Sequence, residues 1–190
     1  MNAVFLAALE VEEFCRSRGW KFCFIGGVAL QRWGEPRQTI DVDLTLLTGF
    51  GGEEAYADAL LARFKPRRPD ARAFALSRRV LLLQNEQDTG IDIAFGGLPF
   101  EAGTVERASP FQIAPDRSIL TCSAEDLIVH KCFASRPQDW VDVENILVKR
   151  GARLNLPHVF TELTLLTELK GEPGIVIQLR RLIDQVNRPG

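Results

Sequence analysis

Residues 39–47, TIDVDLTLL, constrain the fold most, because polar and apolar side chains alternate along them. Such alternation is typical of a β-strand that buries one face in a core. Ahead of this segment, an apolar run from Phe22 to Ile25 ends in Gly26-Gly27, and Val28 to Trp33 has helical character. Two strands joined by a tight glycine turn and a short helix predict a sheet with helices packed on it.

The remaining pattern changes from mixed structure to helix in the second half of the chain. Strands are expected over residues 80–83 and 91–95, as a hairpin, with a weaker signal over 111–114. Helices are expected over residues 3–18, 53–64, 124–133, 137–150, 157–170 and 173–187. Ser123 suits an N-cap and Pro137 a first helical turn, whereas 65–72 reads as a basic, Pro-broken loop and 96–115 as a Gly/Pro-rich stretch. The fold class is therefore α+β, with an α/β core over 1–115 and a helical C-terminal segment over 116–190 packed on that core.

Composition excludes several classes of protein. The 190 residues are 46% hydrophobic and 25% charged, so one globular domain, or one with a small appendage, is expected. A formal net charge of −2 argues against a dedicated nucleic-acid-binding module, which is usually basic. Four cysteines without a CxxC pair and two histidines give no zinc spacing, so reduced core thiols are expected. The N-terminus fits neither a signal peptide nor a membrane span, and we expect a cytoplasmic protein with no membrane partner.

The alternating strand carries two acids on one face. Asp41 and Asp43 project to the same side, roughly 7 Å apart by strand rise, and Ile40, Val42 and Leu44 are expected to be buried on the other side. Neighbouring carboxylates repel each other unless a cation lies between them, and hard oxygen ligands suit Mg²⁺. The alternative is a solvated strand face with Lys or Arg partners across it.

Two further features strengthen the functional interpretation. Gly26-Gly27 lies between a strand and a helix, where backbone N–H groups can hold a phosphate with no Cβ in the way. Asp92 lies inside the apolar segment Ile91 to Phe95, where an unpaired charge is costly, so it implies a partner or a metal. The alternative for Asp92 is an edge-strand position facing water.

Together these motifs resemble the DNA polymerase β-like nucleotidyltransferase superfamily. The resemblance rests on IGGVA at residues 25–29, RQTIDVDL at 37–44 and the later single acid Asp92. The R-x-[ST]-x-D-x-D form is similar to the AbiEii-type, toxin-like branch, as are SAEDLIVHK at 123–131 and RPQDWVD at 136–142. One departure is the Gly-Gly turn, since many active relatives have Gly-Ser and thus a further hydroxyl. The resemblance implies a small mixed nucleotidyltransferase-type sheet flanked by helices.

The resemblance also implies the roles of individual residues. Asp41, Asp43 and Asp92 would be catalytic and hold two Mg²⁺ ions, with Asp92 also helping to deprotonate the acceptor hydroxyl. The nucleotide-binding residues implied are Gly26, Gly27, Arg37, Thr39, Lys131, Arg136 and Asp139. For three of these, alternatives stay open: Lys131 as a solvent-facing helix residue, Arg136 as an ion-pair partner of Asp139 or Asp142, and Asp139 as a favourable charge at a helix start.

The resulting hypothesis is a Mg²⁺-dependent nucleotidyltransferase that moves an NMP from an NTP, such as ATP, to a hydroxyl acceptor and releases pyrophosphate. The acceptor is open among a protein, an RNA end and a small molecule, and the toxin-like branch implies an antitoxin partner. The alternative is a non-catalytic binding or regulatory module with the same fold. A metal-dependent phosphohydrolase is disfavoured because the chain has no His-rich metal cluster.

Overall fold

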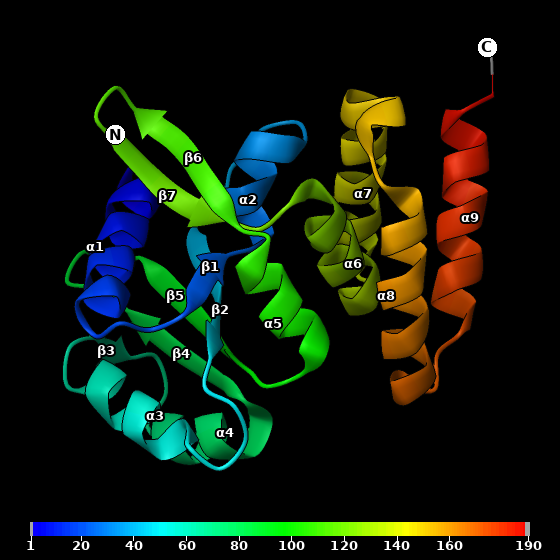
Figure 1. Cartoon of the computed structure of the whole chain (residues 1–190). Coiled ribbons are helices and arrows are strands. Elements are labelled where there is room, and N and C mark those ends of the chain that lie inside the picture. Colours follow the sequence, from blue (N-terminus) through cyan, green and yellow to red (C-terminus); the bar gives the residue numbers. More distant parts are fainter. Residues whose placement is uncertain (1, 189–190) are drawn as a thin grey trace. The chain divides into compact units, whose positions relative to one another are not determined.

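The computed structural model describes residues 2–188 and divides into two compact units (Figure 1). Unit 1 comprises Met1–Val28 and Gln38–Cys122, and unit 2 comprises Ala29–Arg37 and Ser123–Gly190. The predicted boundary after residue 115 differs from this division, because the chain goes on to form a further strand of the sheet before it leaves unit 1. Residues 1 and 189–190 of the predicted domains lie outside the described residues.

A mixed sheet forms the centre of unit 1. Within the described residues it has seven strands in the order β3-β4-β5-β2-β1-β7-β6. Pairs β2–β5 and β1–β7 are parallel, and the other neighbours are antiparallel. The strands are β1 (Phe22–Phe24), β2 (Asp41–Leu47), β3 (Lys65–Pro66), β4 (Val80–Gln84), β5 (Gly90–Gly96), β6 (Ser109–Ala114) and β7 (Arg117–Thr121). The predicted α+β class is confirmed, as is the antiparallel pairing of the segments at 80–83 and 91–95.

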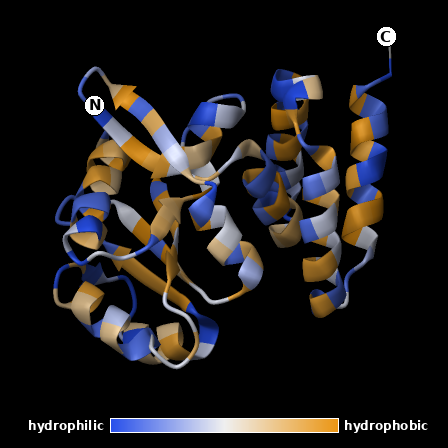
Figure 2. Ribbon diagram, in the orientation of Figure 1, coloured by the Kyte–Doolittle hydropathy of each residue, from blue (hydrophilic) through white to orange (hydrophobic). Residues whose placement is uncertain are grey.

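Helices of unit 1 bury one face of this sheet. Three of them, α1 (Ala3–Ser17), α3 (Glu53–Leu61) and α4 (Ala71–Arg78), share one apolar cluster with Val42, Leu44 and other strand residues. A fourth, α5 (Pro99–Glu106), contacts β1 and β2 from the other face, the one to which Thr45 points. The strands are accordingly coloured as largely hydrophobic in Figure 2. Because side chains alternate along a strand, Asp41 and Asp43 lie on the face of β2 opposite to this cluster.

Three sequence predictions for unit 1 are wrong in detail. The strand at 39–47 begins only at Asp41, so Ile40 precedes the paired segment and is 71% exposed instead of buried. Strand β3 and the start of α4 lie inside the stretch 65–72 that was predicted as a loop. Helix α5 lies inside the stretch 96–115 that was predicted as Gly/Pro-rich, and it forms there because Pro99 suits a first turn and Glu101 accepts the N–H groups of Gly97 and Leu98.

Unit 2 is helical. It contains the part of α2 (Gly26–Trp33) beyond Val28, then α6 (Ala124–Ala134), α7 (Pro137–Arg150), the 3₁₀ turn η1 (Gly151–Arg153), α8 (Leu156–Lys170) and α9 (Gly174–Val186). The predicted caps are confirmed: Ser123 Oγ accepts the N–H of Asp126 at 3.0 Å, and Pro137 begins α7. Blue and orange bands alternate along these helices in Figure 2, as amphipathic packing requires. No helix within residues 2–188 combines the length and the apolar character needed to cross a bilayer.

All four cysteines are buried and none forms a disulfide within the described residues, as the sequence predicted. Cys15 and Cys23 lie in unit 1 at α1 and β1, Cys122 ends unit 1, and Cys132 lies in α6. Burial raises the pKa of the Cys15 thiol to about 12, so it stays protonated and packs as a small apolar side chain.

Candidate active site

Three carboxylates share one face of the sheet of unit 1. Strands β2 and β5 are parallel neighbours, and their register places Asp43 directly opposite Asp92 and Asp41 opposite Gly90. Residues paired in this way point to the same face, so the three acids form one cluster, which we name the acidic face. Strand β5 lies between β2 and β4, so the alternative of an edge-strand position for Asp92 is wrong.

A guanidinium group neutralises part of the acidic face. Arg67, between β3 and α4, forms an ion pair with Asp92, and its Nη1 lies 3.8 Å from Oδ1 of Asp41. Of the two acids on β2, Asp41 thus has the basic partner that the alternative of a strand face with Lys or Arg partners held. From the sequence, Arg67 is only one of several basic residues in the loop 65–72, since a basic residue in a loop carries no spacing signal for a partner on a distant strand.

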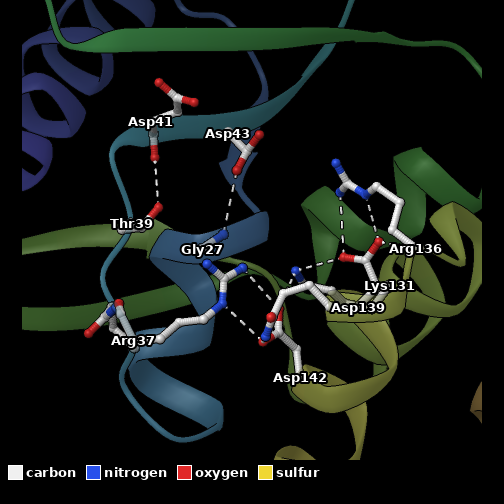
Figure 3. A network of polar contacts seen from close by, with 11 residues as sticks. Gly27, Arg37, Thr39, Asp41, Asp43, Lys131, Arg136, Asp139 and Asp142 are labelled. Atoms are coloured by element: carbon white, nitrogen blue, oxygen red, sulfur yellow. Dashed lines mark hydrogen bonds and ion pairs between the residues drawn. The ribbon is translucent and has the colours of Figure 1, made fainter.

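The Gly26-Gly27 turn, which begins α2, lies against Asp43. The backbone N–H of Gly27 is 3.5 Å from Oδ2 of Asp43, an interaction at the long limit of a hydrogen bond (Figure 3). Gly26 has φ +57°, and a Cβ built on it would lie 2.1 Å from the same oxygen. Only glycine fits here, because both the backbone conformation and the space exclude a side chain.

Thr39 explains the second glycine of the turn. A Cβ on Gly27 would lie 2.4 Å from Thr39 Oγ1, so the threonine hydroxyl fills the space that a serine at position 27 would need. That hydroxyl donates to the backbone carbonyl of Asp41 at 3.2 Å, as drawn in Figure 3. Thr39 therefore links the glycine turn to the start of β2, and the departure from Gly-Ser has a steric cause in this chain.

The acidic face has the donor chemistry of a divalent-cation site. Its polar groups are carboxylate oxygens, as Mg²⁺ prefers, and the carboxylates of Asp43 and Asp41 occupy the space that side chains at Gly26 and Gly90 would fill. A guanidinium already acts there as a cation. Within residues 2–188 no group of three or more His, Cys, Asp or Glu side chains is arranged as a preformed metal site. The chemistry of these donors nevertheless fits a divalent cation.

Unit 2 holds a second charged cluster, on α6, α7 and the segment after α2 (Figure 3). Lys131 Nζ donates to Asp139 at 3.0 Å and to Asp142 at 2.7 Å, and all three side chains are buried. Arg37 donates to both carboxylate oxygens of Asp142, each at 3.0 Å, and Arg136 Nε donates to Asp139 at 2.7 Å. Each buried acid thus binds Lys131 and one arginine, and we name these five residues the lysine network.

The lysine network keeps its acids ionised. Burial by itself raises the pKa of Asp139 and Asp142, but hydrogen bonds from Arg136 and Lys131 to the first, and from Arg37 and Lys131 to the second, lower both pKa values below the usual range. The backbone N–H of Arg136 also donates to Asp139 at 3.2 Å, which satisfies one of the free N–H groups at the start of α7. The network therefore fixes the junction between α6 and α7.

These contacts decide among the alternatives for unit 2. Lys131 is not a solvent-facing helix residue, because its ammonium is enclosed by two carboxylates. Arg136 does pair with Asp139, as one alternative held, and its side chain is nevertheless 74% exposed. Asp142 was absent from the predicted site residues, although its spacing of three from Asp139 places both on one helical face. Nucleotide binding by Arg37, Lys131, Arg136 and Asp139 remains a prediction.

A cavity of unit 1 is separate from the acidic face. It has a volume of about 530 Å³ and is lined by Trp20, Lys21, Leu47 and residues of α5, among others. Leu47 ends β2, whereas Asp41 begins it, so the cavity lies at the opposite end of the strand from the acids. It takes no part in the site described above.

The fold, the paired acids of β2 and β5 and the glycine turn define a nucleotidyltransferase-type protein. Residues 16–173 match the family described as "Nucleotidyl transferase AbiEii toxin, Type IV TA system". The chain belongs to this AbiEii nucleotidyltransferase family, and the resemblance seen in the sequence is confirmed.

Solved structures support the fold. The solution structure of the antibiotic-resistance factor ANT(2″)-Ia is similar at a TM-score of 0.55 and 16% identity, covering 90% of this chain and 95% of that one. An antigenic nucleotidyltransferase-like protein from Paracoccidioides brasiliensis is similar at a TM-score of 0.50 and 14% identity, covering 84% and 86%. At such identities the likeness concerns the fold alone. No curated protein matches the sequence.

Proposed function

We propose that this protein transfers a nucleoside monophosphate from an NTP to a hydroxyl acceptor in a Mg²⁺-dependent reaction that releases pyrophosphate. The observation that carries the proposal is the register of β2 and β5, which sets Asp92 opposite Asp43 and on the same face as Asp41, beside the Gly26-Gly27 turn. Membership of a nucleotidyltransferase family supports the same class of reaction.

In the proposed reaction, the acceptor hydroxyl oxygen attacks the α-phosphorus, and the bond from that phosphorus to the β-phosphate oxygen breaks. The Gly26 and Gly27 N–H groups, at the start of α2, donate to the β- and γ-phosphates, which approach closely because neither residue has a side chain. Asp92 accepts the proton of the attacking hydroxyl. Asp41, Asp43 and Asp92 would hold Mg²⁺, which supplies positive charge that offsets the charge growing on the leaving oxygen.

Two further groups of residues assist the proposed reaction. Thr39 holds the glycine turn at its distance from β2 through its bond to the Asp41 carbonyl. In unit 2, we propose Arg136 as an anion-binding residue, because most of its guanidinium side chain stays exposed while it pairs with Asp139. Arg37, Lys131 and Asp139 position that part of the network, since their charged groups are already engaged with one another or with Asp142.

The test is incubation of the purified full chain with each α-labelled NTP, Mg²⁺ and whole-cell lysate, followed by identification of the labelled species. Asp43→Asn is expected to reduce label transfer by about a thousandfold or more, because it removes a charge from the metal ligands. Asp116→Asn is the matched control: it makes the same change in the exposed β6–β7 turn and is expected to keep transfer. Equal transfer by wild type and Asp43→Asn would overturn the proposal.

The same experiment decides between the proposal and the non-catalytic alternative. Metal-dependent NTP binding without transfer to any component of the lysate would favour a regulatory module. Because the family belongs to type IV toxin–antitoxin systems, we also propose an antitoxin as partner. Growth arrest on expression of the wild type, and none with Asp43→Asn at equal protein level, is the expected result.

A further inference from the structure

Arg67 occupies the position in which the acidic face needs positive charge. Its guanidinium forms an ion pair with Asp92 and reaches to 3.8 Å from Oδ1 of Asp41, so it bridges acids on two strands. Its side chain is 28% exposed, which leaves it accessible to exchange with solvent ions. The backbone N–H of Arg67 donates to the carbonyl of Leu82 at 3.0 Å, so the residue is anchored to β4 while its side chain extends over β5.

Gly90 makes room for this arrangement. It pairs with Asp41 across β2 and β5, and a Cβ on it would lie 2.0 Å from Asp41 Oδ1 and 3.0 Å from Arg67 Nη1. The guanidinium and the Asp41 carboxylate thus meet above a residue without a side chain. The Asp41 carboxylate occupies the space that a side chain at position 90 would fill, and the Arg67 guanidinium reaches the edge of the same space.

The other cations of the same segment are paired elsewhere. Arg68 binds Asp70, Lys65 binds Glu86, and Arg72 binds Glu54 and Asp58. Among the four cations of this segment, within the part of the chain that the structure describes, Arg67 is the one that pairs with the acidic face. The positive charge of the basic loop 65–72 is therefore largely neutralised by nearby acids, whereas Arg67 pairs with the acidic face.

We propose that Arg67 is a displaceable counter-cation that competes with divalent metal for the carboxylates of Asp41 and Asp92 and thereby sets the metal affinity of the site; this inference rests on the proposed function. A guanidinium and a metal ion need the same carboxylate oxygens, so both cannot bind them fully at once. Arg67 stabilises the metal-free acids, which would otherwise repel one another, and metal binding must break its ion pairs.

The experiment is titration of the full chain with Mn²⁺ alone, with free Mn²⁺ measured by electron paramagnetic resonance. Arg67→Gln is expected to lower the Kd for Mn²⁺ about tenfold, which corresponds to the loss of one modest ion-pair competitor. It is also expected to lower the Tm without metal and to recover it at saturating Mn²⁺. Arg68→Gln, in the same loop but paired with Asp70, is the control and is expected to bind Mn²⁺ as the wild type does.

Each outcome separates this inference from the proposed function. A Kd that is unchanged or higher in Arg67→Gln, with binding lost in Asp43→Asn, overturns the competition and leaves the metal site standing. No Mn²⁺ binding in either wild type or Arg67→Gln overturns both. If Arg67→Gln does not fold, Arg67→Lys carries the comparison, since an ammonium on a shorter, single-point donor competes less well and the Kd should still fall.

Discussion

Asp43 and Asp92 lie directly opposite each other on the parallel strands β2 and β5, although they are far apart in the sequence. Parallel strands require a crossover connection, and here the chain between them forms α3, β3, α4 and β4. The pairing places one carboxylate from each strand on the same face, next to the glycine turn that begins α2. The register of β2 and β5 thus brings the DxD motif of β2 and the single acid of β5, each a weak signal alone, into one candidate site.

Gly26→Ala is expected to damage both stability and activity. A left-handed φ costs a non-glycine residue about 1–2 kcal/mol, and the new Cβ must also displace the Asp43 carboxylate. Gly19→Ala is the matched control, since Gly19 has φ +67° with nothing within 4 Å of its Cβ position. Urea unfolding should show a loss of about 1–2 kcal/mol in Gly19→Ala from the backbone alone and a larger loss in Gly26→Ala, whereas label transfer should fall only in Gly26→Ala. Equal transfer rates in the two would contradict the role given to the turn.

Gly27→Ser should be poorly tolerated unless the side chain at position 39 is removed as well. The serine Cβ would come within 2.4 Å of Thr39 Oγ1 and 2.9 Å of its Cβ, so Thr39→Gly is the change that clears the space. Overpacking of this kind costs about 1–3 kcal/mol. In a double-mutant cycle measured by urea unfolding, the double variant should be more stable than the sum of the single changes predicts. Strict additivity would show that the two residues do not compete for space.

The sequence predicted the acidic face well, because period-two alternation places side chains on known faces without knowledge of partners. It was wrong for Ile40, because the start of a strand depends on where pairing begins, and β2 pairs with β5 only from Asp41 onward. Arg67 was inaccessible to this reasoning, since its ion pair with Asp92 joins a loop to a strand through tertiary structure alone.

In unit 2, helix boundaries followed from caps and prolines, but the burial of Lys131 did not. Lysine is rarely buried, and nothing in SAEDLIVHK distinguishes an enclosed ammonium from one in solvent. The acids that enclose Lys131 are Asp139 and Asp142, which stand at helical spacing in the following helix. Only the packing of α6 against α7 brings them to Lys131.

Lys131→Met is expected to lower the free energy of unfolding by about 2–4 kcal/mol, because it leaves two buried carboxylates with one cation each. Lys65→Met is the control. It removes an ammonium from the exposed pair with Glu86 and should cost less than about 1 kcal/mol. The measurement is urea unfolding followed by circular dichroism. Similar losses in both variants would show that the lysine network contributes no more than a surface ion pair.

Acid is expected to destabilise the protein well before its carboxylates are protonated. Burial lowers the pKa of His130 to about 4 from an ordinary value of 6.5, against an opposing effect of Asp126. The unfolded chain therefore takes up a proton near pH 6.5 that the folded protein takes up only near pH 4. Stability should be highest above pH 6.5 and should fall between pH 6.5 and 4, by about 1–3 kcal/mol. Below this range the free energy of unfolding should fall further. Asp139 and Asp142 have lowered pKa values in the folded protein, so their carboxylates are protonated in the unfolded chain before they are protonated in the folded one. The check is the free energy of unfolding across pH 4 to 8 for the wild type and His130→Gln, and a wild-type slope that persists in the variant would show that His130 is not its source.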